Sequence, residues 1–174
     1  KEIKIKINEK LKSNTTYTLN FGSCIKDITE NNIFQDFKYI FSTGSYLDSS
    51  FYKGLTIDAL SKKTIGNVKI FLFEKVIDSF PSNTNPKYLG FSNAKGKFKI
   101  DNIKKGDYFV YACIDKNSNN KIDKLTEKLA VKYTPISTKI TSDSSLNDTI
   151  NLFDNEVDLK IINETYIHPA KVIL

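Results

Sequence analysis

Short runs in which apolar and polar residues alternate predict strands along most of the chain. Lysine or glutamate alternates with isoleucine over residues 1–8, so the chain is expected to begin with a half-buried strand inside a sheet. Glycine- and asparagine-containing turns separate the later runs. The predicted strands that follow are 17–21, 37–42, 51–59, 67–74, 88–92, 97–100, 107–114, 149–153 and 157–162. Because no helical stretch of any length accompanies them, the pattern predicts an all-β fold.

The chain has 174 residues, of which 40% are hydrophobic and 12% aromatic, enough for one or two packed domains. Its formal net charge is +6, and all 26 basic residues are lysines. Arginine, the preferred reader of phosphates and base edges, does not occur, which argues against a nucleic-acid partner. No apolar run is long enough to span a bilayer, and residues 1–10 lack the apolar core of a signal peptide. The chain is therefore expected to be soluble, or to be a mature or trimmed part of something longer.

The sequence contains few of the residues and motifs that catalysis usually requires. His168 is the only histidine, which weighs against Ser/His or Cys/His nucleophilic catalysis and against a histidine-based zinc site. Cys24 and Cys113 fall in different predicted domains and are expected to remain unpaired, with Cys113 buried in a strand. No HExxH, GxSxG or phosphate-binding glycine loop occurs. We therefore expect no enzyme, unless sequence outside this chain holds a catalytic domain.

One loop carries a candidate metal site, directly after the predicted strand at 107–114. Side-chain and carbonyl oxygens recur there at the spacing of a calcium loop, although asparagine replaces the usual glycine and the last glutamate comes one residue late. The expected ligands of a weakly bound Ca²⁺ are Asp115, Asn117, Asn119, Lys121 through its carbonyl, Asp123 and Glu127. The alternative is a polar hairpin loop whose asparagine and aspartate side chains bond their own backbone.

The first part of the chain resembles the second half of a bacterial Ig-like domain of the kind repeated in envelope proteins. The landmarks are a strand start, a Lys-Asp turn and a closing Phe-Ser-Thr-Gly, matched by Leu11, Asn14, Thr15, Tyr17, Lys26, Asp27, Phe41, Ser42, Thr43 and Gly44. The resemblance implies that residues 1–44 are the C-terminal half of such a sandwich, with its first strands outside the sequence. Residues 45–50 then form a linker.

The segment 52–131 resembles the carboxypeptidase regulatory-like, transthyretin-like domains. The motifs that carry this likeness are Gly54, Asp58 and Ala59 before a turn, 66–72, 93–100, Ile103, Gly106, Asp107, Tyr108 and Ala112. The resemblance implies a non-catalytic antiparallel β-sandwich over residues 51–140. CnaB-like relatives of this fold sometimes carry a Lys-Asn isopeptide bond, for which Lys53 is the residue to test, although its partners cannot be identified.

Residues 141–174 are expected to form tail strands, which either complete the second sandwich or begin a further β domain. The order of an Ig-like and a transthyretin-like domain resembles lipid-anchored outer-membrane proteins of Bacteroidota. That resemblance implies a tandem-sandwich module of the cell envelope, on the periplasmic or cell-surface side of the outer membrane. Its lipid anchor would lie outside the given sequence.

Two functions remain open for such a module. The first is a non-enzymatic structural or accessory subunit that docks on a protein partner in the outer membrane. The second is an adhesion module that binds a glycan or another surface ligand. The second function predicts an exposed aromatic row, for which the candidates are Phe51, Tyr52, Tyr88, Phe91, Tyr108 and Tyr111. In alternating strands, such residues can equally be core or cross-strand pairs.

Overall fold

The computed structural model describes residues 4–22, 24–34, 37–76, 84–117, 127–138, 147–154, 165–167 and 171–173. Within these ranges every regular element is a β-strand and none is a helix, which confirms the predicted all-β fold. The strands are β1 (Thr16–Asn20), β2 (Lys38–Ser42), β3 (Ser50–Asp58), β4 (Lys69–Phe73), β5 (Tyr88–Phe91), β6 (Lys97–Ile103), β7 (Asp107–Cys113), β8 (Leu129–Val131), β9 (Ile136–Ser137), β10 (Asn147–Leu152), β11 (Thr165–Ile167) and β12 (Lys171–Ile173).

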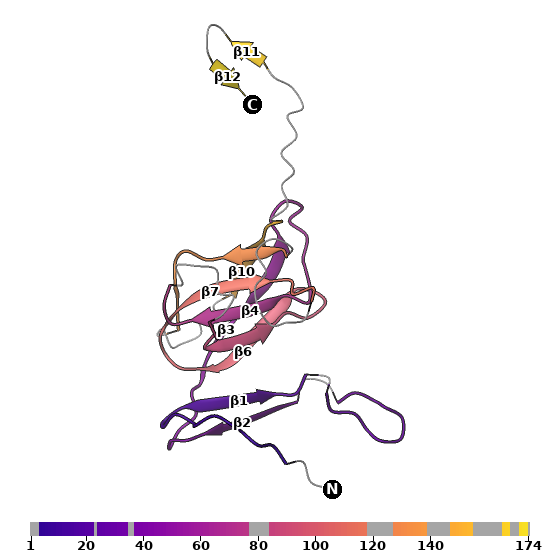
Figure 1. The fold of residues 1–174 in the computed structure, drawn as a ribbon, viewed down its shortest axis with the longest axis vertical. Helices are drawn as coiled ribbons and strands as arrows, with labels where there is room; N and C mark the ends of the chain where they lie inside the picture. The colour runs from indigo at the N-terminus through magenta and orange to yellow at the C-terminus, as the bar shows by residue number, and fades with distance from the viewer. Residues whose placement is uncertain are drawn as a thin grey trace.

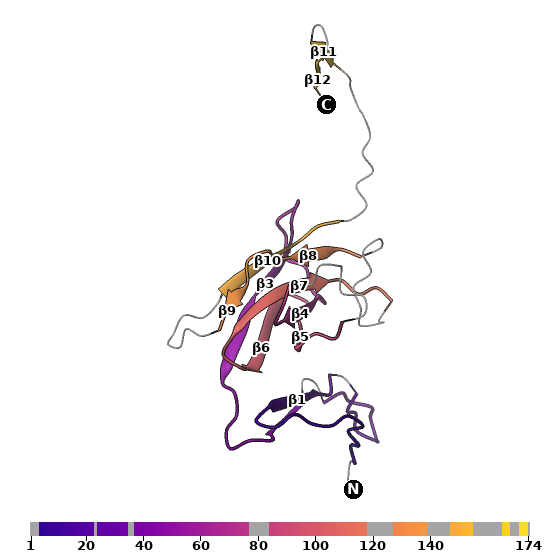
Figure 2. The same ribbon diagram turned by 60° about the vertical axis from the view of Figure 1, so that its left-hand side comes forward.

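Two sheets face each other in the middle of the molecule and form a sandwich (Figures 1 and 2). One sheet has three strands in the order β10-β3-β6. The other has the order β5-β4-β7-β8, with β9 also paired to β7. Most neighbours are antiparallel, as the turn-separated runs predict, and β10 is parallel to β3. Many strands thus pair with strands that are close to them in sequence. The pairing of β3 with β10 is different, because it joins the first and the last strand of the sandwich.

The core lies between the inner faces of these sheets. From the three-stranded sheet it receives Tyr52, Phe98, Ile100, Ile150 and Leu152, and from the other sheet Ile70, Leu72, Tyr108, Val110 and Ala112. These residues sit at alternate positions of their strands, because side chains two apart share one face of a strand. At about 25 cal/mol per Å² of apolar surface removed from water, this core is the main source of stability.

Strand β4 departs from the alternating pattern and is apolar on both faces. Ile70 and Leu72 point into the main core, whereas Phe71 and Phe73 belong to a second buried cluster with Tyr111, Cys113 and Leu129. Phe73 and Tyr111 meet edge to face, with ring centroids 5.4 Å apart. A continuous apolar run of this kind is typical of a strand that is covered on both sides.

The turn between β5 and β6 shows why glycine stands at residue 96. The Gly96 backbone has φ +77°, a left-handed conformation that costs glycine little. Its N–H donates to the carbonyl of Asn93 at 2.9 Å, and the Asn93 N–H donates to the carbonyl of Lys97 at 2.8 Å. The Asn93 side chain also accepts from the backbone N–H groups of Lys95 and Lys97, both at 3.0 Å. Local turn chemistry thus fixes the tight reversal by which the chain passes from β5 in one sheet to β6 in the other.

The sandwich extends past residue 140, into the tail that was expected either to complete it or to begin a further domain. Strand β10 lies within the predicted tail 141–174, yet all six of its residues pair with β3. Ile150 and Leu152 are buried in the main core, so the first part of the tail completes the sandwich. Strands β11 and β12 pair antiparallel with each other. The predicted strand 157–162 lies outside the described residues.

The N-terminal unit is smaller than a sandwich in the part of the chain that the structure describes. Within 4–44 it contains one antiparallel hairpin, β1–β2, which pairs Tyr17 with Phe41 and Leu19 with Tyr39. The predicted strand at 1–8 is not seen: residues 4–8 are outside any strand and are exposed. A strand needs a neighbour for its backbone groups, and none of the strands in the described ranges is paired with residues 5–8. Within the described ranges, no helix has the length and apolarity to cross a membrane.

Replacing Gly54 by alanine tests the parallel pairing of β3 and β10. A Cβ atom at Gly54 would lie 2.0 Å from the carbonyl oxygen of Asp148 and 2.9 Å from Cζ of Phe98. We expect Gly54→Ala to lower the free energy of unfolding by about 1–3 kcal/mol, because backbone on β10 must move. Urea denaturation measures the change.

The matched control is Gly106→Ala, where the nearest atom to the new Cβ is the Tyr108 hydroxyl oxygen at 3.2 Å. A side chain gives way more easily than a paired strand. Equal losses of stability in the two variants would contradict the close approach of β3 and β10.

Candidate functional site

One residue of the linker fixes the hairpin against the sandwich. The Asp48 backbone N–H donates to the Thr16 hydroxyl oxygen on β1 at 2.9 Å. The Asp48 carbonyl accepts from the side-chain amide of Asn102 on β6 at 3.0 Å. Thr16 is buried, and Asn102 adopts a left-handed backbone (φ 58°) that asparagine tolerates. Both units are thus bonded to the same linker residue.

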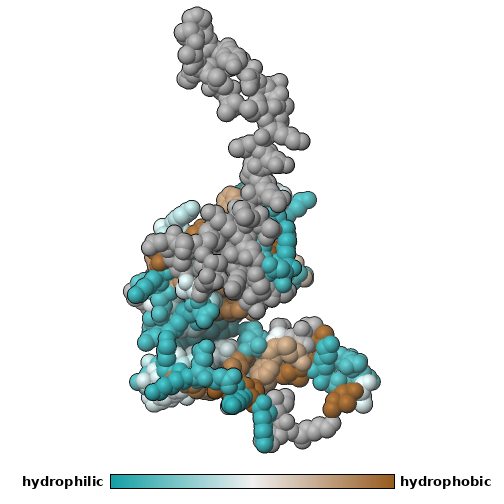
Figure 3. All heavy atoms as spheres, in the orientation of Figure 1, coloured by the Kyte–Doolittle hydropathy of each residue, from teal (hydrophilic) through white to brown (hydrophobic). Residues whose placement is uncertain are grey.

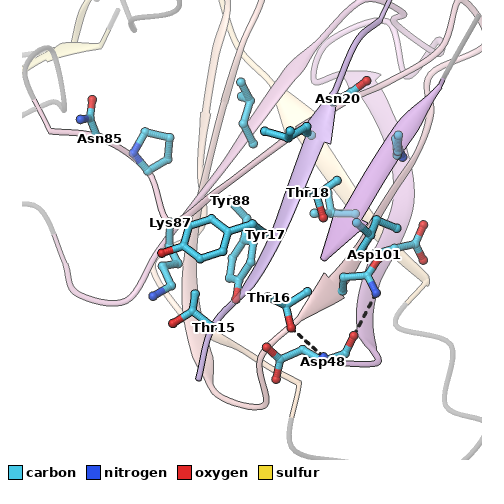
Figure 4. Close-up of a pocket in the computed structure, with 18 of the residues that line it drawn as sticks. Thr15, Thr16, Tyr17, Thr18, Asn20, Asp48, Asn85, Lys87, Tyr88 and Asp101 are labelled. Carbon is cyan, nitrogen blue, oxygen red and sulfur yellow. Dashed lines mark hydrogen bonds between the residues drawn. The ribbon is translucent and has the colours of Figure 1, made fainter. Parts of the chain in front are cut away.

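A cleft of about 2220 Å³ lies between the units (Figure 4). Strand β1 forms one wall, and β5, the chain before it and the end of β6 form the other. Leu89 and Phe91 on β5 are 38% and 46% exposed in this wall. Thr18 and Asn20 contribute polar groups from β1. The cleft therefore combines a partly exposed apolar surface with hydroxyl and amide groups, as ligand sites commonly do.

The charge of the cleft is predominantly positive. Seven lysines and four carboxylate residues line it. Three of these lysines have carboxylate partners: Lys99 with Asp101 at 2.7 Å, Lys87 with Glu74 at 3.4 Å and Lys69 with Asp115 at 2.6 Å. The Lys69 ammonium also lies 6.0 Å from the centroid of the Phe91 ring, within cation–π range.

The predicted calcium loop begins at a buried carboxylate. The Asp115 side chain is 0% exposed and carries the ion pair with Lys69. Glu127 is also buried, and its Oε1 accepts from the backbone N–H of Lys116 at 3.0 Å. The structure therefore holds the first and last predicted ligands at the end of β7 and the start of β8. Asn117 is exposed, and Asn119, Lys121 and Asp123 lie outside the described residues.

No metal-binding group of three or more His, Cys, Asp or Glu residues occurs among the residues that the structure describes. Three of the six predicted ligands lie beyond these residues, so the calcium site stays a prediction. The ion pair with Lys69 was not foreseen, because 46 residues separate Lys69 from Asp115. The one available signal was the lysine at the start of an otherwise apolar strand.

Cys113 lies next to this carboxylate pair. Its side chain is fully buried, and it forms no disulfide with the exposed Cys24, as expected. Burial raises the pKa of the Cys113 thiol well above its ordinary value, and the nearby Glu127 and Asp115 carboxylates raise it further. A thiol in such surroundings stays protonated and reacts slowly.

The six aromatic residues predicted to form an exposed row for glycan binding do not form one. Tyr52, Tyr108 and Tyr111 are buried: the first two fill the main core and the third the second cluster. Tyr52 also donates its hydroxyl to Asp148 at 2.8 Å. Only Phe91 of the six is highly exposed, and it lies in the cleft with Tyr88. Alternation could not decide which face of each strand is inside.

Lys53, the residue considered for an isopeptide bond, is on the outer face of β3. It pairs in register with Asn147 on β10. Its ammonium group lies 5.6 Å from the centroid of the Phe51 ring, on the side of the strand away from the buried Tyr52. Isopeptide formation at Lys53 would therefore take place outside the core.

A second surface stands out on the hairpin. Six aromatic residues lie on or beside one face of β1–β2, and we call this surface the aromatic face: Tyr17, Phe21, Phe34, Phe37, Tyr39 and Phe41. Neighbouring rings are 5.5 to 5.9 Å apart. Tyr39 and Phe34 are 54% and 59% exposed. Brown spheres of hydrophobic residues are visible on this lower unit in Figure 3.

Comparison with known proteins agrees with the N-terminal resemblance. A family model described as a bacterial Ig-like domain matches residues 1–43, about a quarter of the chain. No curated protein and no solved structure matches. The Ig-like character of the N-terminal unit is thus supported, and the sandwich that follows has no counterpart from these comparisons.

Thiol labelling tests the buried position of Cys113. At about pH 8, a maleimide should label Cys24 rapidly, because it is exposed, and leave Cys113 protonated and unlabelled. Mass spectrometry should show one label on the folded protein and two in denaturant. The variant Cys24→Ser should take up none until it is unfolded. Rapid labelling of folded Cys24→Ser would contradict the placement of Cys113.

Proposed function

We propose that this chain is a non-enzymatic structural module of a cell-envelope lipoprotein and an accessory subunit of an outer-membrane protein complex. In this proposal the sandwich built on β3–β10 is a transthyretin-like packing domain. The Ig-like unit before it makes the contact with the partner. The observation that carries the proposal is the aromatic face of the hairpin.

The aromatic face has the composition of a protein interface rather than of an ordinary surface. Aromatic side chains supply much of the buried area at the centre of interfaces, where charged residues are depleted. Exposed apolar residues near it, Ile28 and Ile33, widen the apolar surface of this unit. Contiguous apolar patches on soluble domains commonly mark contact sites. A protein partner that covers this face would remove its cost of exposure to water.

The backbone of the hairpin offers the same partner a further means of attachment. Strands β1 and β2 pair only with each other within the described residues, so each has an outer edge. An extended segment can add to such an edge by main-chain hydrogen bonds. Aromatic burial and strand addition together would give a stable contact from a unit of this size.

Co-purification of the native full-length protein from membranes tests the proposal. In mild detergent we expect a stoichiometric outer-membrane protein, identified by mass spectrometry. The double variant Phe34→Ser and Tyr39→Ser should release that partner, because it removes two highly exposed rings of the aromatic face.

The matched control is Tyr133→Ser, which removes a 91% exposed tyrosine from the sandwich domain and should leave the partner bound. Recovery of the protein alone, without any stoichiometric partner, would overturn the proposal. Equal loss of the partner in the control would show that the aromatic face is not the contact.

A second candidate function is the binding of a glycan or another surface ligand, as in adhesion modules. The specific observation in its favour is the cleft between the hairpin and the sandwich. Exposed apolar groups on β5 form one wall, and β1 contributes both apolar side chains and the polar groups of Thr18 and Asn20 to the other. A sugar ring has an apolar face and a hydroxyl rim, which this combination suits.

We also propose that the loop after β7 binds Ca²⁺ weakly, with a Kd on the order of 1 mM, as in extracellular modules. Calcium at about 10 mM should then raise the free energy of unfolding by about 1.4 kcal/mol. Magnesium should do less, because it demands stricter geometry. Thermal denaturation with and without each ion measures the effect.

Asp123→Asn should abolish the calcium effect, since it removes a carboxylate from the expected ligand set. Glu9→Gln, which neutralises an exposed carboxylate of the N-terminal unit, should preserve it. If calcium and magnesium stabilise both variants equally, the loop is a polar turn and not a metal site.

A further inference from the structure

The cleft between β1 and the β5–β6 region is held by the bonds of Asp48 to Thr16 and Asn102, so its walls are positioned before any ligand arrives. Pre-positioned walls reduce the ordering cost of binding. Figure 4 shows side chains from both units lining the same space, among them Thr18, Asn20 and Asp101. A long cleft between two units suits an extended ligand more than a compact one.

Apolar side chains line both walls of the cleft. Leu89 and Phe91 remain partly exposed side by side on β5, at alternate positions. Hydroxyl and amide groups lie among the apolar side chains, with Asn67 and Asn85 from the sandwich wall and Thr18 and Asn20 from the other. The chemistry is that of a sugar-binding surface, in which a ring stacks on an apolar platform and its hydroxyls bond to the rim.

The charge of the lining selects the class of sugar. Lys10, Lys12, Lys38 and Lys75 line the cleft and make no ion pair with a carboxylate of the described residues. Concave surfaces of one sign concentrate counter-ions of the other. The cations are all lysines, and these act as point charges without the bidentate fork by which arginine grips a single phosphate. Such a field favours repeated, spaced anions along a chain.

We propose that this cleft binds an acidic polysaccharide, a sugar chain with carboxylate groups, which stacks on Leu89 and Phe91 and pairs with Lys38 and Lys75. The proposal rests on the second candidate function and adds the ligand class to it. The aromatic face shares Tyr17 and Phe21 with the cleft lining, whereas Phe34 and Tyr39 lie outside it. The variant Phe34→Ser with Tyr39→Ser therefore tests docking separately from ligand binding.

Isothermal titration of the whole chain with polygalacturonate tests the proposal, with neutral dextran and oligo(dT) as comparison polymers. We expect binding to polygalacturonate that weakens as salt rises, and little binding to the other two. The variant Lys38→Gln with Lys75→Gln should bind about fivefold or more weakly, because it removes two cations from the cleft. Phe91→Ser should lose binding through the platform.

The charge-matched control is Lys95→Gln with Lys105→Gln, which removes two exposed lysines outside the cleft and should change affinity little. Unchanged melting temperatures show that each variant is folded. An equal loss in the control, or equal binding of oligo(dT), would show a general polyanion effect and overturn the proposal. Preference for dextran would overturn the proposal of an acidic polysaccharide but would still support glycan binding. If none of the polymers binds, both the acidic-polysaccharide proposal and the glycan-binding function are overturned.

Discussion

The two-sided pairing of β3 is the constraint on which the rest of the structure depends. This strand lies between β6, its antiparallel neighbour, and β10, which is nearly 100 residues further along in sequence and parallel to it. Gly54 permits the close approach of β10, and Tyr52 ties the same strand to Asp148. Without β10, β3 would become an edge strand and the core would lose Ile150 and Leu152. The linker that positions the hairpin also runs directly into β3.

The sequence predicted the strands best where local chemistry decides them. The runs at 17–21, 37–42, 51–59 and 107–114 appear within a residue or two of their predicted bounds, because alternation and turn residues act over short distances. The segment 1–8 has the same alternation and forms no strand over 4–8, since pairing requires a neighbour as well as a pattern. The short strands β8 and β9 have too few residues to show any period.

The candidate sites were predicted less well than the fold. The loop after β7 could be found because oxygen-bearing residues recur at ligand spacing within a dozen positions. The cleft could not, because its walls come from β1, β5 and β6, which are far apart in sequence and are joined through Asp48. The aromatic residues of the strands were correctly seen as abundant, but burial of Tyr108 depends on the sheet that lies opposite, and burial of Tyr111 depends on the second cluster at the other face of β7. A period of two gives the faces of a strand without saying which is covered.

The attachment of both units to the backbone of Asp48 has a mechanical consequence. One bond leads from its N–H to the hairpin and the other from its carbonyl to the sandwich, so a single residue holds both units. These two bonds keep the walls of the cleft in place while it is empty. A pull on the N-terminal unit would load the two bonds before it strained either sheet, and the cleft would widen when they broke. In such an arrangement, force on the N-terminal unit and occupancy of the cleft would be linked quantities.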